Sequence, residues 1–127
     1  MSMFVDVNVV SLNVTDWERA KKFYREVLGW PVAFSDDNAG WEEYGPDGVA
    51  HVSITKVAPG EPVPPAVGGT TLVLRVQDAH AVTAELRARG IKCDDVISIP
   101  GMVTYGCFYD PEGNRIQFAS MALPPAA

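Results

Sequence analysis

The sequence predicts one α+β domain of 127 residues in which the same unit occurs twice: a strand, a helix and about three further strands. Three observations lead to this prediction. Equivalent positions in the two halves keep a nearly constant spacing, a turn motif recurs, and a Pro/Gly-rich segment separates the halves. We expect module one at about residues 5–58, a linker at residues 59–69 and module two at about residues 70–121.

The first half begins with a strand and an amphipathic helix. Residues 9–14 (Val-Val-Ser-Leu-Asn-Val) alternate between two faces with the two-residue period of a half-buried strand. Apolar side chains at helical spacing follow in residues 17–28, and Gly29 ends the pattern. Thr15 and Glu18 fit a capping box at the start of this helix.

The second half follows the same plan. Residues 71–76 form a strand pattern, Asp78 is placed to cap a helix, and Gly90 ends that helix. The last residues of the two strands, Val14 and Val76, are 62 positions apart, and the two helix-ending glycines are 61 apart. This near-constant offset indicates a duplicated unit.

The later strands repeat as well. Residues 44–48 (Tyr-Gly-Pro-Asp-Gly) match residues 109–113 (Tyr-Asp-Pro-Glu-Gly), and each segment has the Pro and Gly of a tight turn. Strand patterns follow at residues 51–54 and 115–118. Between the halves, residues 59–69 contain too many Pro and Gly residues for a helix or a central strand, which predicts a linker.

This order of elements, together with two local motifs, resembles the vicinal oxygen chelate superfamily of glyoxalases, bleomycin resistance proteins and extradiol dioxygenases. The first motif is residues 12–16 (Leu-Asn-Val-Thr-Asp) followed by residues 23–30 (Phe-Tyr-Arg-Glu-Val-Leu-Gly-Trp). The second is residues 110–114 (Asp-Pro-Glu-Gly-Asn) followed by residues 116–118 (Ile-Gln-Phe). With the internal repeat, the resemblance covers about residues 5–120.

The resemblance implies tandem βαβββ modules whose mixed sheets curl into a cup with the helices outside. It also implies a dimer, which is common among members. Many members bind a divalent metal in the cup through four side chains, one from each module's first and last strand. Others are metal-free drug-binding proteins, and the residues at the four metal positions of this sequence resemble that bleomycin-resistance-like branch.

The four metal-ligand positions of the family carry poor ligands in this sequence. They correspond to Val9, Ser53, Thr71 and Gln117, where His is expected at the first position and Glu in the last strands. Divalent metals in proteins require imidazole, carboxylate or thiolate donors. The sequence therefore predicts no metal and no other cofactor, and it disfavours the isomerase and oxygenase reactions that depend on the metal.

Strand alternation predicts which side chains face away from the helices. This face should hold Ser11, Asn13, His51, Ser53, Thr71, Val73, Arg75, Arg115 and Gln117. The alternation does not determine the face of five further residues: Trp41, Tyr44, Tyr105, Cys107 and Tyr109. A pocket with aromatic walls and a few hydrogen-bonding groups suits an organic ligand. The predicted ligand-binding residues are Ser11, Asn13, Trp41, His51, Ser53, Thr71, Arg75, Tyr105, Cys107, Arg115 and Gln117.

Several of these residues have two interpretations. His51 is the candidate acid or base because imidazole titrates near neutral pH. The other interpretation is a hydrogen-bonded strand histidine without turnover, which the lack of a visible orienting partner in the sequence favours. Cys107 is either a nucleophile or a small buried apolar residue. Of the neighbours Glu42 and Glu43, at most one can enter the cup, because adjacent strand residues point to opposite faces.

Trp41 is either a stacking surface for a flat aromatic ligand or a packing residue. Arg75 and Arg115 either bind an anionic ligand group or line a wet dimer interface. The sequence does not decide between these interpretations.

Composition limits the class of function. The formal net charge of −6 disfavours nucleic acid and anionic membranes as partners. No apolar run approaches the roughly 20 residues of a membrane span. Two cysteines are too few for a disulfide framework. We therefore expect a soluble cytoplasmic protein.

Two functional hypotheses follow, and a third is weaker. The first is a metal-independent homodimer that binds and sequesters a hydrophobic or aromatic natural product, as in drug self-resistance. The second is a metal-free isomerase, cyclase or hydrolase acting on a small organic intermediate, with His51 as acid or base. The third is a metalloenzyme with relocated ligands. The sequence leaves open the ligand's identity and whether modules pair within one chain or between chains.

Overall fold

A computed structural model of the chain describes Met3 and residues 6–62 and 71–121. The chain divides into two compact units at residues 64 and 65. Of the predicted linker, residues 59–62 contain neither helix nor strand, and residues 63–69 lie outside the described residues.

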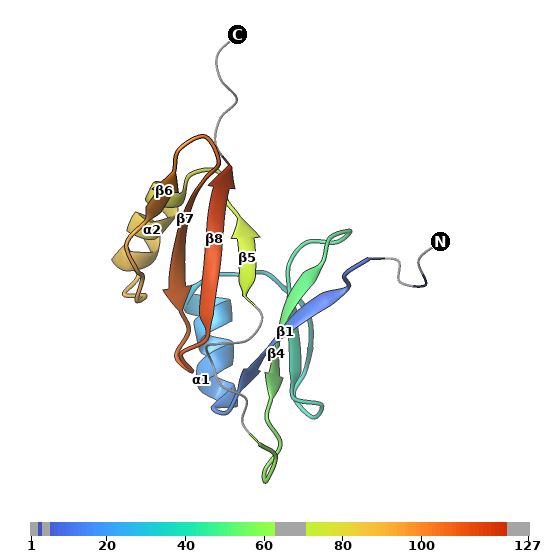
Figure 1. Cartoon of the computed structure of the whole chain (residues 1–127). Coiled ribbons are helices and arrows are strands. Elements are labelled where there is room, and N and C mark those ends of the chain that lie inside the picture. Colours follow the sequence, from blue (N-terminus) through green and yellow to red (C-terminus); the bar gives the residue numbers. More distant parts are fainter. Residues whose placement is uncertain (1–2, 4–5, 63–70, 122–127) are drawn as a thin grey trace. The chain divides into compact units, whose positions relative to one another are not determined.

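Unit one is a mixed four-stranded sheet with one helical segment (Figure 1). Along the chain its elements are β1 (Val9–Val14), α1 (Trp17–Lys22), the π-helical turn η1 (Phe23–Val27), β2 (Val32–Asp36), β3 (Trp41–Tyr44) and β4 (His51–Lys56). The strand order is β1-β4-β3-β2. β1 runs parallel to β4, and the other pairs are antiparallel.

Unit two repeats this arrangement. Its elements are β5 (Leu72–Arg75), α2 (Ala79–Ala88), β6 (Ile97–Ile99), β7 (Val103–Tyr109) and β8 (Arg115–Met121). The strand order is β5-β8-β7-β6, again with the first and last strands parallel. The predicted α+β class and the tandem βαβββ modules are therefore confirmed, while a cup shared by the two sheets stays a prediction.

The helix ends follow local sequence chemistry. Asp16 caps α1, because its carboxylate accepts the main-chain N–H of the residue three positions later at 3.1 Å. The capping-box prediction placed this role on Thr15 and was wrong by one residue. Asp78 caps α2, as predicted, and accepts two main-chain N–H groups at 3.0 and 3.1 Å. Gly29 and Gly90 have φ angles of 72° and 78°, a region that glycine adopts without strain.

The first helix differs from the regular helix predicted over residues 17–28, because its second half is the π-helical turn η1. The N–H of Leu28 bonds to the carbonyl of Phe23, five residues earlier, at 2.8 Å. In a regular α-helix three consecutive side chains spread over about 200° around the helix axis. In η1, by contrast, three consecutive side chains all point inward: Phe23 and Tyr24 are buried, and Arg25 reaches the sheet, where its Nε bonds to Glu42 at 3.0 Å.

One face of β3 is tied to this helical segment. The carboxylate of Glu42 is fully buried and accepts bonds from Arg25, from Ser35 Oγ at 2.7 Å and from the hydroxyl of Tyr44. Burial alone would raise the pKa of Glu42, but these hydrogen bonds and the guanidinium charge bring it below its usual value. The Tyr44 ring stacks on Tyr24 at a centroid distance of 5.4 Å. These contacts fix the position of β3, whose opposite face carries Trp41 and Glu43 side chains.

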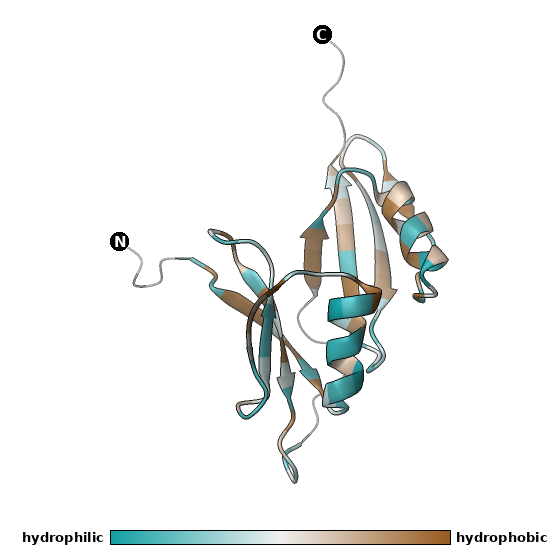
Figure 2. Cartoon of the chain, turned by 180° about the vertical axis from the view of Figure 1, so that it is seen from behind, coloured by the Kyte–Doolittle hydropathy of each residue, from teal (hydrophilic) through white to brown (hydrophobic). Residues whose placement is uncertain are grey.

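The core of unit two lies between α2 and strands β7 and β8. Phe108 and Phe118 stack there with ring centroids 6.3 Å apart, and both are buried. Figure 2 shows strand β5 as largely hydrophobic and the visible side of α1 as mostly hydrophilic. Within the described ranges, no helix is long and apolar enough to cross a membrane.

Candidate functional site

The strand register of unit one shows which side chains lie opposite the helix. Residues paired across a sheet share a face, and Glu42 and Tyr44 of β3 belong to the helix face. The other face, which we call the open face of unit one, holds Val9, Ser11, Asn13, Trp41, Glu43, His51, Ser53 and Thr55. The structure thus places Ser11, Asn13, His51 and Ser53 where strand alternation predicts them, and it assigns Trp41 to the same face.

Three side chains of the open face form a hydrogen-bonded chain. Glu43 accepts a bond from the indole Nε1 of Trp41 at 2.9 Å, and its second oxygen lies 2.9 Å from Nδ1 of His51. Nε2 of His51 lies 2.9 Å from the carbonyl oxygen of Pro46. The carboxylate therefore holds both rings in fixed orientations.

The two contacts of His51 shift its pKa upward. A carboxylate and a carbonyl oxygen both accept hydrogen bonds, so both ring nitrogens donate when the imidazole is protonated. The hydrogen bonds that His51 donates to Glu43 and to the carbonyl of Pro46 raise the pKa of His51. The bonds that Glu43 accepts from His51 and Trp41 lower the pKa of Glu43. The imidazolium has no lone pair to take up a proton, so this arrangement disfavours His51 as a general base.

The middle of the open face consists of hydroxyl groups. Ser53 on β4 lies directly between Ser11 on β1 and Glu43 on β3 in the strand register. The hydroxyls of Ser11 and Thr55 bond to one another, whereas Ser53 Oγ is buried without a hydrogen-bond partner. Charged groups on this face are paired, and its centre is neutral and polar.

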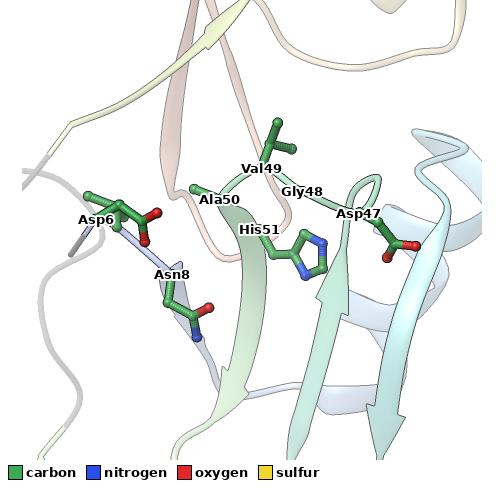
Figure 3. A pocket seen from close by; sticks show the side chains of 8 residues that line it. Asp6, Asn8, Asp47, Gly48, Val49, Ala50 and His51 are labelled. Carbon is green, nitrogen blue, oxygen red and sulfur yellow. The ribbon is translucent and has the colours of Figure 1, made fainter.

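A hollow of about 560 Å³ adjoins one end of this face. His51 lines it together with segments that the sequence did not mark as functional: residues 6–8, which precede β1, and the turn residues 47–50, which precede β4. In Figure 3 the His51 ring lies between Asn8 and Asp47. The turn motif indicated a hairpin here, and no sequence signal showed that its residues line a hollow.

The register of unit two places the remaining predicted residues on a corresponding face. This open face of unit two, opposite α2, holds Val73, Arg75, Tyr105, Cys107, Tyr109, Arg115, Gln117 and Ala119, and Thr71 directly precedes β5. Tyr105 and Cys107, whose face the alternation did not determine, thus share this face with Arg115 and Gln117, and Cys107 pairs directly with Gln117. Exposed apolar side chains also lie on this face, including Val73, Ile97 and Ile99.

Asp94 accepts the hydrogen bonds at the polar end of this face, and the sequence did not indicate it as a site residue. Its Oδ2 accepts bonds from the thiol of Cys107 at 3.0 Å and from the hydroxyl of Tyr109 at 2.8 Å, and Arg115 Nε lies 3.9 Å away. The bonds from Cys107 and Tyr109 lower the pKa of Asp94. Asp94 lies in an irregular segment between α2 and β6, where no periodicity predicts the direction of a side chain.

These contacts weaken the case for Cys107 as a nucleophile. Burial raises the pKa of the Cys107 thiol, and the hydrogen bond to Asp94 raises it further. A nucleophilic cysteine requires the opposite shift, because the thiolate is the reactive form. Beside it, the side-chain oxygen of Gln117 accepts bonds from Arg115 Nη1 at 2.8 Å and Nη2 at 3.2 Å in the orientation that satisfies both groups.

The four metal-ligand positions of the resembled family can be tested against this geometry. Val9 and Ser53 share the open face of unit one with an offset of two residues between parallel strands, and Thr71 and Gln117 have the same offset in unit two. The equal offsets support the residue assignment. None of the four side chains carries an imidazole, carboxylate or thiolate, and Ser53 contributes only a neutral buried hydroxyl. The residues do not fit a divalent metal, and the described ranges contain no cluster of three or more His, Cys, Asp or Glu residues suited to one.

Comparisons with known proteins agree with this architecture. The chain is similar in structure to the antibiotic-binding protein TnmS3 from Streptomyces sp. CB03234, with 27% identity, 96% of this chain and 100% of that chain covered, and a TM-score of 0.77. A glyoxalase/bleomycin resistance protein from the same strain shows 28% identity, coverage of 89% and 98%, and a TM-score of 0.69.

A glyoxalase/bleomycin resistance protein/dioxygenase from Nocardioides shares the fold at 16% identity, with coverage of 100% and 91% and a TM-score of 0.76. No curated protein matches the chain significantly in sequence. The family model of the Glyoxalase/Bleomycin resistance protein/Dioxygenase superfamily matches residues 6–118. The chain therefore belongs to the glyoxalase/bleomycin resistance protein/dioxygenase superfamily.

Proposed function

We propose that this protein is a metal-independent small-molecule-binding protein that sequesters a hydrophobic or aromatic natural product. The observation that carries the proposal is the open face of unit one. There the indole of Trp41 is held by Glu43 beside neutral hydroxyl groups, while the family's metal positions lack charged donors. An oriented aromatic ring next to a few polar groups is the usual composition of a site for an organic ligand.

The relatives support the same function. TnmS3 is an antibiotic-binding protein, and it matches nearly the whole chain at 27% identity. We propose that the ligand contacts come from the open-face residues that the sequence singles out, with Trp41 as the stacking surface. We further propose, from the family resemblance and the acidic charge, a cytoplasmic homodimer that does not bind nucleic acid.

A metal-free enzyme with His51 as general base is the weaker candidate. The pairing of both His51 nitrogens with acceptors favours the imidazolium, which cannot abstract a proton. Cys107 is likewise held as a thiol. Binding without turnover requires neither His51 nor Cys107 to react, so it is compatible with the contacts of both residues.

The proposal can be tested by titrating the protein with a panel of flat polycyclic natural products, including anthraquinones, while tryptophan fluorescence is recorded. We expect at least one compound to quench the fluorescence saturably. Trp41→Phe should remove most of the quenching, because the remaining tryptophans lie on or near the helix. The matched control is Trp30→Phe, since Trp30 stacks on Tyr44 on the helix face at a centroid distance of 5.8 Å.

If no compound quenches the fluorescence saturably, the proposed ligand site on the open face of unit one is refuted. Equal effects of the two substitutions would also contradict it, because the ligand would then not distinguish the open face from the helix face. Conversion of a compound during the titration, monitored by mass spectrometry, would favour the enzyme instead.

A further inference from the structure

Among the described residues of unit one, Ser53 is the buried polar residue whose side chain has no hydrogen-bond partner. Its side chain is fully buried, and its Oγ has no hydrogen-bond partner. A buried hydroxyl without a partner loses its hydrogen bonds to water on folding and gains none in return, which is destabilising. Native proteins leave few such groups, so an unsatisfied hydroxyl at this position requires an explanation.

The neighbours of Ser53 bond to one another, and none of them bonds to Ser53 Oγ. Across the strands it faces Ser11, whose hydroxyl bonds to Thr55, and Glu43, whose two oxygens bind Trp41 and His51. Ser53 is therefore the unsatisfied centre of a face whose other polar groups are paired.

We infer that Ser53 Oγ is the hydrogen-bond anchor for a neutral hydroxyl or carbonyl group of an aromatic ligand whose ring lies against Trp41. This inference rests on the proposed binding function and adds a ligand class and a specificity-determining residue to it. Ser53 occupies one of the four positions at which the family can bind metal, so a neutral hydrogen bond would replace the metal as the polar anchor. Because Ser53 is fully buried, this anchor requires the side chains around it to move apart when the ligand binds.

The charges on this face explain the preference for a neutral group. His51 is paired with Glu43 when it is protonated, so the described residues of this face offer no unpaired cation to a carboxylate. A carboxylate placed at Ser53 would lose its hydration and approach the negative charge of Glu43 across the strand. A phenol or a ketone loses less hydration and is satisfied by a single hydroxyl, which can donate or accept.

The test compares three ligands that differ in one substituent: 9-phenanthrol, phenanthrene and phenanthrene-9-carboxylate. Their affinities are measured by calorimetry or NMR titration for the wild type and for Ser53→Ala. We expect the wild type to prefer 9-phenanthrol over phenanthrene by about 3- to 10-fold, the contribution of one neutral hydrogen bond. Ser53→Ala should abolish this preference and leave the affinity for phenanthrene unchanged.

Ser35→Ala is the matched control, because it removes a serine hydroxyl from the same sheet on the helix face, where that hydroxyl bonds to Glu42. Ser35→Ala should lower the melting temperature and keep the ligand preference. Ser53→Ala should keep or raise the melting temperature, because it removes an unsatisfied group.

The outcomes separate this inference from the proposed function. If phenanthrene and 9-phenanthrol bind equally well to the wild type, or if Ser53→Ala weakens both equally, the anchor is refuted while aromatic binding stands. Preferred binding of the carboxylate would overturn the ligand class. If the wild type binds none of the three, the aromatic pocket itself fails together with the anchor.

Discussion

Replacing Glu42 with Gln should destabilise the protein through the helix face of β3. The carboxylate accepts bonds from Arg25 Nε at 3.0 Å, from Ser35 Oγ at 2.7 Å and from the Tyr44 hydroxyl. In Glu42→Gln an amide NH₂ group would replace one carboxylate oxygen and face hydrogen-bond donors. The substitution would also remove the negative charge opposite the Arg25 guanidinium. Breaking a fully buried ion pair costs about 3–5 kcal/mol, but Arg25 is 42% exposed and water can solvate part of its charge.

We therefore expect Glu42→Gln to lower the free energy of unfolding by about 2 kcal/mol. For a chain of this size the melting temperature should fall by about 5–10 °C, measured by circular dichroism or calorimetry. The exposed Glu26→Gln in η1 is the matched control and should change stability by less than about 0.5 kcal/mol.

The pH dependence gives a second check on the same network. Because the pKa of Glu42 is lowered in the folded protein, its stabilisation is complete above the unfolded value of 4.5. It is lost as the pH falls through the lower folded pKa. The stability difference between wild type and Glu42→Gln should therefore be constant above about pH 5 and shrink in acid. A difference of less than 1 °C at neutral pH, or one that persists unchanged into acid, would refute the reasoning.

Two further predictions concern the other unit and the ligand face. Gly106→Ala should lower the free energy of unfolding by about 1–3 kcal/mol through overpacking, because a new Cβ would lie 2.8 Å from the Phe118 ring. Chemical denaturation measures this loss. If the contact with Phe118 is its cause, adding Phe118→Leu should recover part of it. Glu43→Gln should lower the His51 pKa in an NMR titration, because it removes the largest influence that raises it. The contribution of the His51–Glu43 pair to stability is complete below the unfolded His51 pKa of 6.5 and is lost as the pH rises through the folded value. An unchanged His51 titration in Glu43→Gln would show that the pair is not formed in solution.

The sequence was sufficient for those parts of the fold that depend on local patterns. Two-residue alternation placed β1, β4, β5 and β8, and their side-chain directions followed because successive strand residues point to opposite faces. The cap at Asp78 and the glycine ends of both helices also follow from local chemistry. The cap at Asp16 was misplaced on Thr15, since adjacent Thr and Asp residues both suit that position.

The π-helical turn could not be predicted in this way. Its residues Tyr24 and Arg25 contact Tyr44 and Glu42 of β3, and contacts between residues so distant in the sequence leave no local pattern. The same holds for Trp41 and Tyr105, whose faces required the pairing of their strands with β4 and β8.

The sequence by itself determined the duplicated α+β plan, the residues at the four family positions and the poor fit of those residues to a metal. These depend on residue identity and spacing along the chain. Only the tertiary structure decided that Glu43 orients His51, that Asp94 binds Cys107 and that Ser53 is left without a partner. Hydrogen bonds of this kind depend on strand register and side-chain rotamers, which join residues remote in sequence and leave no periodic signal in it.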